Sequence, residues 1–171
     1  PIELMKACIA TVNQEMIAKS NENEEYAGMG TTFVAATVSD HKVTVMNIGD
    51  SRLYYGNKEL KQITVDHSYV EELINAGMLD REQGRLHPKK NVITRALGSQ
   101  AATPDFFEFE AQEGYLLLCS DGLSNMISDD ELKELLLDHD QIANKTNQMI
   151  ARANEYGGKD NISLVIVDLK R

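Results

Sequence analysis

The sequence contains no tryptophan, only three prolines and only two cysteines among its 171 residues. Two cysteines cannot form the disulfide framework that stabilises small secreted domains, so we expect a reducing compartment and a cytoplasmic protein. Cys8 falls in a helical pattern and Cys119 in an apolar run, and both are predicted to be small buried side chains. There is also no run of 18 or more apolar residues and no signal-peptide pattern, so no membrane partner is expected.

Basic residues are scarce as well, with 17 Lys and Arg against 27 Asp and Glu and a formal net charge of -10. This balance argues against nucleic acid and anionic lipid as partners, because both require surfaces rich in Lys and Arg. The remaining composition, with 42% hydrophobic and 26% charged residues, is ordinary for one globular domain with a real core. An acidic protein can collect cations, but acidic surfaces are also common without that function.

The order of sequence patterns indicates an α+β domain. Apolar residues recur every three or four positions from residue 2 to about residue 20, which predicts an amphipathic helix. β-Branched runs and two-residue alternation then predict strands, of which we expect the first to form one antiparallel meander. The expected strands are 31–38, 41–48, 51–55, 58–65, 106–109, 115–119 and 162–169, with further helices beginning at 129 and spanning 141–155.

Residues 68–90 interrupt the strands with helical fragments that are broken by Gly77 and Gly84. Short helical fragments broken by glycine predict a lobe on the surface of the sheet rather than a core element. The four histidines show no zinc-ligand spacing with one another or with cysteine. Gly-x-Ser-x-Gly, P-loop and Cys-x-x-Cys motifs are absent too, so hydrolase triads, nucleotide cradles and zinc ribbons have no support.

Three aspartates occupy junctions between a predicted strand and a loop with glycine beside them. Asp50 and Asp121 each follow a strand, and Asp160 precedes one. If these strands are neighbours, the three carboxylates converge at one end of the sheet, where a magnesium, manganese or calcium ion would relieve their repulsion. Each motif alone is more often a tight turn without chemistry, so only the combination favours a metal site.

Six short motifs follow one another along the chain. They are Gly30-Thr31-Thr32, Gly49-Asp50-Ser51-Arg52, Asp66-His67-Ser68, Ile93-Thr94-Arg95-Ala96-Leu97-Gly98, Ser120-Asp121-Gly122-Leu123-Ser124-Asn125 and Gly158-Lys159-Asp160-Asn161-Ile162-Ser163. In this order they closely resemble the metal-dependent protein phosphatases (PPM family, type 2C class), in their bacterial serine/threonine phosphatase branch. The resemblance extends from the first helix to Arg171.

The resemblance implies a four-layer α-β-β-α sandwich of antiparallel sheets. It also implies hydrolysis of phosphoserine and phosphothreonine in proteins by a water activated by Mn²⁺ or Mg²⁺. Phosphorylated proteins, substrates of a serine/threonine kinase, would then be the partners. Such chemistry needs no protein nucleophile, which agrees with the missing triad motifs, and no residue beyond the metal ligands is expected to be catalytic.

By the same resemblance, Asp121 and Asp160 correspond to carboxylates that hold the first metal of a binuclear pair. Asp50 corresponds to a ligand of a third, more weakly bound metal. Asn125 stands where other members carry an aspartate ligand of that third metal, and because an amide oxygen is a weaker ligand its contribution stays open.

The remaining motifs receive supporting roles from the resemblance. Residues Ser68 to Lys90 correspond to a flap subdomain that contacts substrate. Four residues are implied to brace the sheet and the loops beside the site: Asp66, His67, Thr94 and Arg95.

One family feature is absent from the chain, namely an opening strand pair with an aspartate and a phosphate-binding arginine, followed by an Asp-Gly-x-Gly-Gly motif. We therefore expect residues 1–171 to be one catalytic domain, truncated at its N-terminus, inactive alone and able to associate through exposed sheet edges. The alternative is a non-catalytic binding module with a type 2C-like fold. A third hypothesis, an unrelated carboxylate-metal phosphoesterase, is disfavoured by the six ordered motifs.

Overall fold

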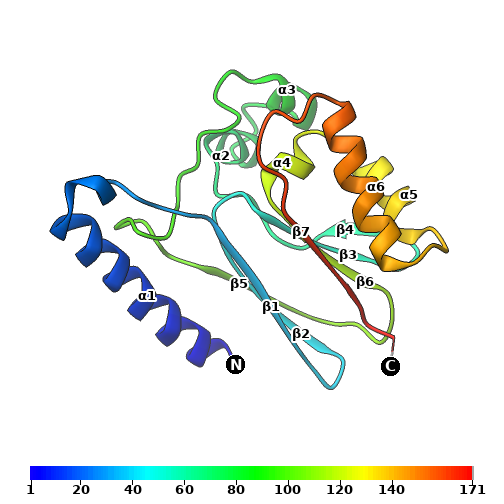
Figure 1. Ribbon diagram of the computed structural model, residues 1–171, viewed down its shortest axis with the longest axis horizontal. Helices are drawn as coiled ribbons and strands as arrows, with labels where there is room; N and C mark the ends of the chain where they lie inside the picture. The colour runs from blue at the N-terminus through cyan, green and yellow to red at the C-terminus, as the bar shows by residue number, and fades with distance from the viewer. Residues whose placement is uncertain (171) are drawn as a thin grey trace.

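The computed structural model describes residues 1–170, which form two antiparallel sheets packed face to face with helices on their outer sides (Figure 1). The first sheet has the order β1-β2-β5 and the second the order β4-β3-β6-β7. The strands are β1 Phe33–Ser39, β2 Lys42–Ile48, β3 Arg52–Gly56, β4 Leu60–Gln62, β5 Asp105–Glu110, β6 Tyr115–Cys119 and β7 Leu164–Asp168. The helices are α1 Ile2–Glu22, η1 Glu24–Tyr26, α2 Tyr69–Asn75, α3 Arg81–Leu86, α4 Asp121–Ser124, α5 Asp129–Leu137 and α6 Ile142–Glu155.

Two-residue alternation along the strands produces the layers, because successive side chains point to opposite faces of a sheet. In β2, Val43 and Val45 face the second sheet, whereas Met46 and Ile48 face α1. In the second sheet, Leu53 and Leu116 face the first sheet. Their neighbours Tyr54, Leu117 and Cys119 pack instead under α4, α5 and α6. The expected four-layer α-β-β-α sandwich of antiparallel sheets is therefore confirmed.

Helix α1 covers the outer face of the first sheet only in part. Ile9 is its buried residue and packs with Met46 and Ile48. Other members of the predicted apolar face remain in solvent, since Leu4 is 70% exposed and Cys8 is also exposed. The expectation of a buried Cys8 was wrong, whereas Cys119 is buried as predicted. The periodicity identified the helix but not how much of its apolar face the sheet covers.

The first strands do not form a single meander, and this expectation was wrong. β1 and β2 form a hairpin in the first sheet, but β3 belongs to the second sheet, where it pairs with β4 and β6. The chain crosses between the sheets at Gly49-Asp50, where Gly49 has a φ of 103° that favours glycine. The crossing places Asp50 where the two sheets meet.

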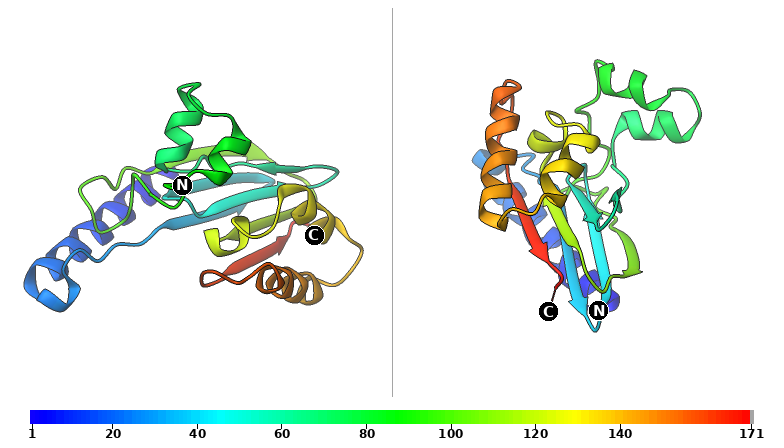
Figure 2. Two further views of the ribbon diagram at one scale, coloured as in Figure 1. Left: turned by 90° about the horizontal axis from the view of Figure 1, so that it is seen from above. Right: turned by 90° about the vertical axis from the view of Figure 1, so that its right-hand side faces the viewer.

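A lobe formed by α2 and α3 projects from one end of the sandwich (Figure 2). Ser68 caps α2 by accepting a hydrogen bond from the Glu71 amide, and Asp80 forms a capping box with Gln83 at α3. Arg81 of α3 donates to both carboxylate oxygens of Glu71 in α2, each across 3.2 Å. These contacts join the two short helices of the lobe. No helix among residues 1–170 combines the length and apolarity needed to cross a membrane.

Candidate active site

A pocket of about 340 Å³ opens between the crossing at Asp50, the start of α4 and the α2–α3 lobe. Its walls include Asp50, Asp121 and Asn125, which are three of the four residues that the sequence predicted to lie at a metal site. Asp160, the fourth, does not line this pocket and lies in the exposed loop before β7.

The carboxyl group of Asp50 is partly buried at the crossing between the sheets. This burial, followed by the charges of Asp121 and Asp66, raises the pKa of Asp50 to about 6. The nearby Arg52 has the opposite influence but does not cancel them. A carboxylate in this state gains from a positive charge, which would relieve both desolvation and repulsion.

Asp121 follows β6 directly and begins the short helix α4. Gly122 is required next to it, because a Cβ at this position would lie 2.2 Å from the carbonyl oxygen of Asn161. This close approach places Asp121 beside the loop that carries Asp160. Burial and then the charge of Asp160 raise the pKa of Asp121 above its ordinary value. Asp121 thus lies close enough to both Asp50 and Asp160 for their charges to interact.

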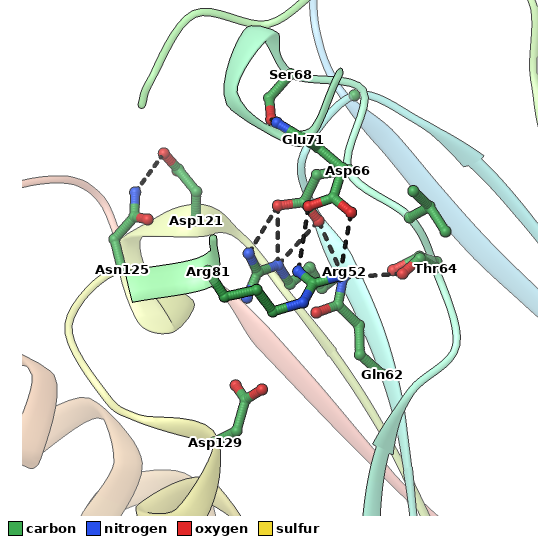
Figure 3. Close-up of polar contacts among 12 residues, drawn as sticks. Arg52, Gln62, Thr64, Asp66, Ser68, Glu71, Arg81, Asp121, Asn125 and Asp129 are labelled. Atoms are coloured by element: carbon green, nitrogen blue, oxygen red, sulfur yellow. Dashed lines mark hydrogen bonds and ion pairs between the residues drawn. The ribbon is translucent and has the colours of Figure 1, made fainter. Parts of the chain in front are cut away.

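Asn125, the C-cap of α4, donates a hydrogen bond from its Nδ2 to Oδ2 of Asp121 across 3.1 Å (Figure 3). The two residues are four positions apart on one face of the helix, which brings their side chains together. In this arrangement the amide nitrogen faces the carboxylate, and the amide oxygen is the atom that Asn125 has to offer a cation.

Arg52 is the principal pocket residue to which the sequence analysis gave no role. Its Nε and NH2 donate to Asp66 in a bidentate pair, with NH2 to Oδ2 at 2.7 Å (Figure 3). Its NH1 donates to the Tyr54 hydroxyl. Tyr54 in turn donates to Asp129 at the start of α5. The signal was present in the alternation, since Arg52 and Tyr54 share one face of β3.

The lobe supplies the basic side of the pocket. Arg81, Arg85 and Lys90 line it from α3 and the loop that follows, opposite Asp50 and Asp121. All three are exposed residues, and Arg81 is held by its ion pair with Glu71. The pocket wall therefore combines the carboxylates of Asp50 and Asp121 with cationic groups from the lobe, an arrangement that suits an anion bound next to cations.

The donor set fits a hard divalent cation, because it consists of carboxylate oxygens and one amide oxygen. Burial, and after it neighbouring negative charge, raises the pKa values of Asp50 and Asp121, and a bound cation would offset both effects. Within residues 1–170, however, no group of three His, Cys, Asp or Glu side chains is close enough to hold an ion by itself. The described residues therefore offer some of the ligands of a metal site rather than a complete set.

Comparison with known proteins agrees with this geometry. The family model described as Protein phosphatase 2C matches residues 2–164. The serine/threonine phosphatase stp of Listeria monocytogenes serotype 4b (strain F2365) is 40% identical over 167 residues, which cover 96% of this chain and 66% of that protein. The chain thus spans slightly less than two thirds of the length of this relative.

Solved structures give the same result. The serine/threonine phosphatase Stp1 from Staphylococcus aureus superimposes with a TM-score of 0.94 at 35% identity, covering 98% of this chain and 67% of that one. The catalytic domain of the serine threonine protein phosphatase PstP, in complex with two manganese ions, superimposes with a TM-score of 0.82 at 33% identity, covering 91% and 66%. The chain belongs to the protein phosphatase 2C family, in its bacterial serine/threonine phosphatase branch.

Proposed function

We propose that the chain forms most of the catalytic domain of a metal-dependent phosphatase that hydrolyses phosphoserine and phosphothreonine in proteins. The observation that carries this proposal is the pocket in which Asp50 and Asp121 face the basic residues of the lobe. A phosphate group needs cations around its oxygens, and carboxylates can approach it only through a bound metal. Family membership supports the same activity.

The metal ligands in this proposal are Asp121 and Asp160 for the first ion of a binuclear pair and Asp50 for a third, weaker site that Asn125 borders. Mn²⁺ or Mg²⁺ bound there would supply positive charge and an activated water for hydrolysis. The aspartates would hold the ions, and the fold keeps their carboxylates close together. Arg52 stays paired with Asp66 and is therefore part of the wall of the site.

The segment from Ser68 to Lys90 acts in this proposal as the flap subdomain that contacts the phosphoprotein. Its support is that Arg81, Arg85 and Lys90 line the same pocket as the aspartates. The substrates would be proteins phosphorylated by a serine/threonine kinase. A cytoplasmic location belongs to the proposal, since neither Cys8 nor Cys119 forms a disulfide.

Residues 1–171 form a single domain in this proposal and tend to associate with a partner through sheet edges. β1 and β7 are edge strands, and they carry exposed apolar side chains such as Val38 at 48% and Val165 at 57%. Such edges pair readily with another strand. Size-exclusion chromatography of residues 1–171 should therefore show concentration-dependent association, and a strictly monomeric profile would contradict this part of the proposal.

The activity is tested with the protein expressed from its full reading frame and a phosphothreonine peptide in the presence of Mn²⁺. Asp121→Ala and Asp160→Ala should each reduce turnover by at least about a hundredfold, because metal ligation is lost. Asp130→Asn, an exposed change in the first turn of α5, serves as the matched control and should leave turnover unchanged. Wild-type activity in the two alanine variants would refute the proposal.

The binding-module alternative depends on whether the full reading frame contains an Asp-Gly-x-Gly-Gly motif, which does not occur in residues 1–171. Residues 1–171 assayed alone should accordingly bind Mn²⁺ weakly and show no turnover. If the protein from the full reading frame also binds the phosphopeptide without hydrolysing it, the binding-module function replaces the catalytic one.

A further inference from the structure

The turn that carries Asp50 is held on both sides by a single residue, His67. The amide of Gly49 donates to Nδ1 of His67 across 3.1 Å, and the carbonyl of Gly49 accepts from the His67 amide across 2.9 Å. Asn47 adds a hydrogen bond from its Nδ2 to the same carbonyl, at 3.2 Å. Both backbone polar groups of Gly49, the residue before Asp50, are therefore hydrogen-bonded to protein groups.

The imidazole of His67 is itself fixed, since the residue is only 5% exposed. Because Nδ1 accepts from Gly49, the ring proton lies on Nε2, which donates to Oδ2 of Asp105 across 2.9 Å. Arg95 donates to the other oxygen of Asp105 at 2.9 Å. The 3.3 Å separation between Arg95 NH1 and His67 Nε2 follows from their binding to one carboxylate, because two N–H donors cannot bond to each other.

The charges around Asp105 favour this arrangement. Partial burial raises the pKa of Asp105, but the hydrogen bonds from His67 and Arg95 outweigh it, and the pKa lies below its ordinary value. A charged Asp105 accepts the Nε2 proton and so selects the ring form in which Nδ1 can accept from Gly49. Hydrogen bonds thereby connect Arg95 and Asp105, by way of the His67 ring, to the backbone of Gly49 next to Asp50.

The turn has little room to adopt another conformation. Gly49 has a positive φ, and a Cβ at this position would lie 2.4 Å from Cγ2 of Thr32. On the other side of Asp50, the hydroxyl groups of Thr32 and Ser51 are hydrogen-bonded at 2.8 Å. The backbone of the turn is therefore determined by contacts rather than by the aspartate, which leaves the Asp50 side chain available to the pocket.

We infer that His67 is a positioning residue for Asp50: its Nδ1 fixes the Gly49 peptide and thereby directs the Asp50 carboxylate into the pocket beside Asp121. This inference rests on the proposed function, in which Asp50 is a metal ligand. It assigns to the Asp66-His67-Ser68 motif a role in the metal site itself, beyond bracing the sheet. The Asp105–Arg95 pair supports the role by holding the ring form of His67.

Two substitutions of His67 test its two side-chain hydrogen bonds, to Gly49 and to Asp105, one at a time. His67→Asn keeps an acceptor atom at the position of Nδ1, next to Gly49, but loses the reach to Asp105. His67→Gln reaches toward Asp105 but has no acceptor next to Gly49. Each variant removes one buried hydrogen bond, so both should lose similar thermal stability. A merely structural role would therefore affect metal binding equally in the two variants.

The measurement is the Mn²⁺ concentration that broadens the NMR signals of Asp50 and Asp121 in residues 1–171, which detects weak binding without catalysis. His67→Gln should raise the concentration needed at Asp50 about tenfold, as loss of a residue that orients a metal ligand commonly does. His67→Asn should stay within about threefold of the wild type, by the same reasoning. Equal shifts in the two variants would overturn the inference.

Nitrogen NMR of the His67 ring in the unsubstituted chain provides a test that does not depend on how a variant folds. A proton on Nε2 and none on Nδ1 supports the inference, and a proton on Nδ1 overturns it. The failure of the proposed function is distinguishable, because it would appear as unchanged Mn²⁺ broadening in Asp50→Asn. If Asp50→Asn weakens binding and His67→Gln does not, only the role of His67 is refuted.

Discussion

Asn125 and Asp121 are joined by a hydrogen bond in which the amide nitrogen, and not the amide oxygen, faces the carboxylate at 3.1 Å. The bond compensates part of the charge of Asp121, whose pKa is raised by burial and by Asp160. At the same time it occupies a carboxylate oxygen that a cation would otherwise use. Asn125 therefore favours the metal-free state of the pocket over the metal-bound state.

Asn125→Asp should shift this balance toward metal binding. A second carboxylate four residues from Asp121 adds repulsion in the metal-free protein and an oxygen ligand in the bound one. We expect Mn²⁺ affinity, measured by calorimetry, to increase about tenfold, which corresponds to about 1.4 kcal/mol. The metal-free melting temperature should fall by about 2–4 °C.

Asn125→Ala is the matched control for this prediction, because it removes the hydrogen bond without adding a charge. Its Mn²⁺ affinity should rise less than that of Asn125→Asp, because the variant loses the competing hydrogen bond but gains no oxygen ligand. If Asn125→Asp and Asn125→Ala bind Mn²⁺ equally, the position does not contribute a ligand.

Asp50→Asn should stabilise the metal-free protein at neutral pH. Folding raises the pKa of Asp50 to about 6, mainly through burial, so its charged form disfavours the folded state. This penalty is complete above about pH 6 and disappears as the pH falls toward the unfolded-state pKa near 4. At pH 7.5 the variant should melt about 2–6 °C higher than the unsubstituted chain, and the difference should vanish near pH 4.

Glu113→Gln, an exposed change in the turn before β6, is the control for the pH profile. It removes one negative charge far from the pocket and should leave the melting temperature nearly unchanged between pH 4 and 7.5. A difference between Asp50→Asn and the unsubstituted chain that grows as the pH falls would contradict the assigned direction of the Asp50 pKa.

The sequence predicted the strands because they depend on local alternation, whereas the four layers were expected from the family resemblance. Val43 and Val45 alternate with Met46 along β2, and this period of two is readable without a structure. The division of the strands between two sheets was not readable in this way. It depends on pairing between distant segments, such as Val45 with Phe107, and local pattern contains no information on such partners.

The candidate site was predicted to a similar extent. Asp50 and Asp121 were recognisable from their glycine-flanked strand ends, and the structure brings them to one pocket. Arg52 and His67 acquire their roles only through partners at Asp66 and Asp105, whose proximity comes from the fold. The role of a charged or polar residue within a strand or helix therefore could not be predicted until the structure showed its partner.

Lys145 is such a residue, and its replacement should destabilise the protein. It is fully buried on the apolar face of α6, and its Nζ donates to the carbonyls of Leu136 and Asp138 at the end of α5, at 2.6 and 2.7 Å. The ammonium also lies 4.1 Å from the centre of the Tyr115 ring. Lys145→Met retains most of the side-chain volume but leaves two carbonyls without a donor, which should lower the free energy of unfolding by about 2–4 kcal/mol.

Urea denaturation followed by circular dichroism measures this loss, with Lys61→Met on the exposed face of β4 as the control. The control should change the free energy of unfolding by less than about 0.5 kcal/mol. Similar urea midpoints for Lys145→Met and the unsubstituted chain would show that the buried ammonium contributes no net stability.

The lobe provides the last prediction, which concerns substrate choice rather than hydrolysis. Arg85 lines the pocket from α3 and is exposed, so its charge can meet acidic or phosphorylated residues of a bound peptide. In the protein expressed from its full reading frame, Arg85→Glu should lower kcat/KM for an acidic phosphothreonine peptide about tenfold, because like charges are brought together. Activity on a small aryl phosphate, which has no acidic residues for Arg85 to contact, should fall much less. Lys89→Glu is the matched control, since Lys89 lies over the Tyr69 ring and outside the pocket wall, and it should affect both substrates slightly. Equal losses on the peptide and the aryl phosphate in Arg85→Glu would indicate that the lobe supports the hydrolytic site itself and does not select the substrate.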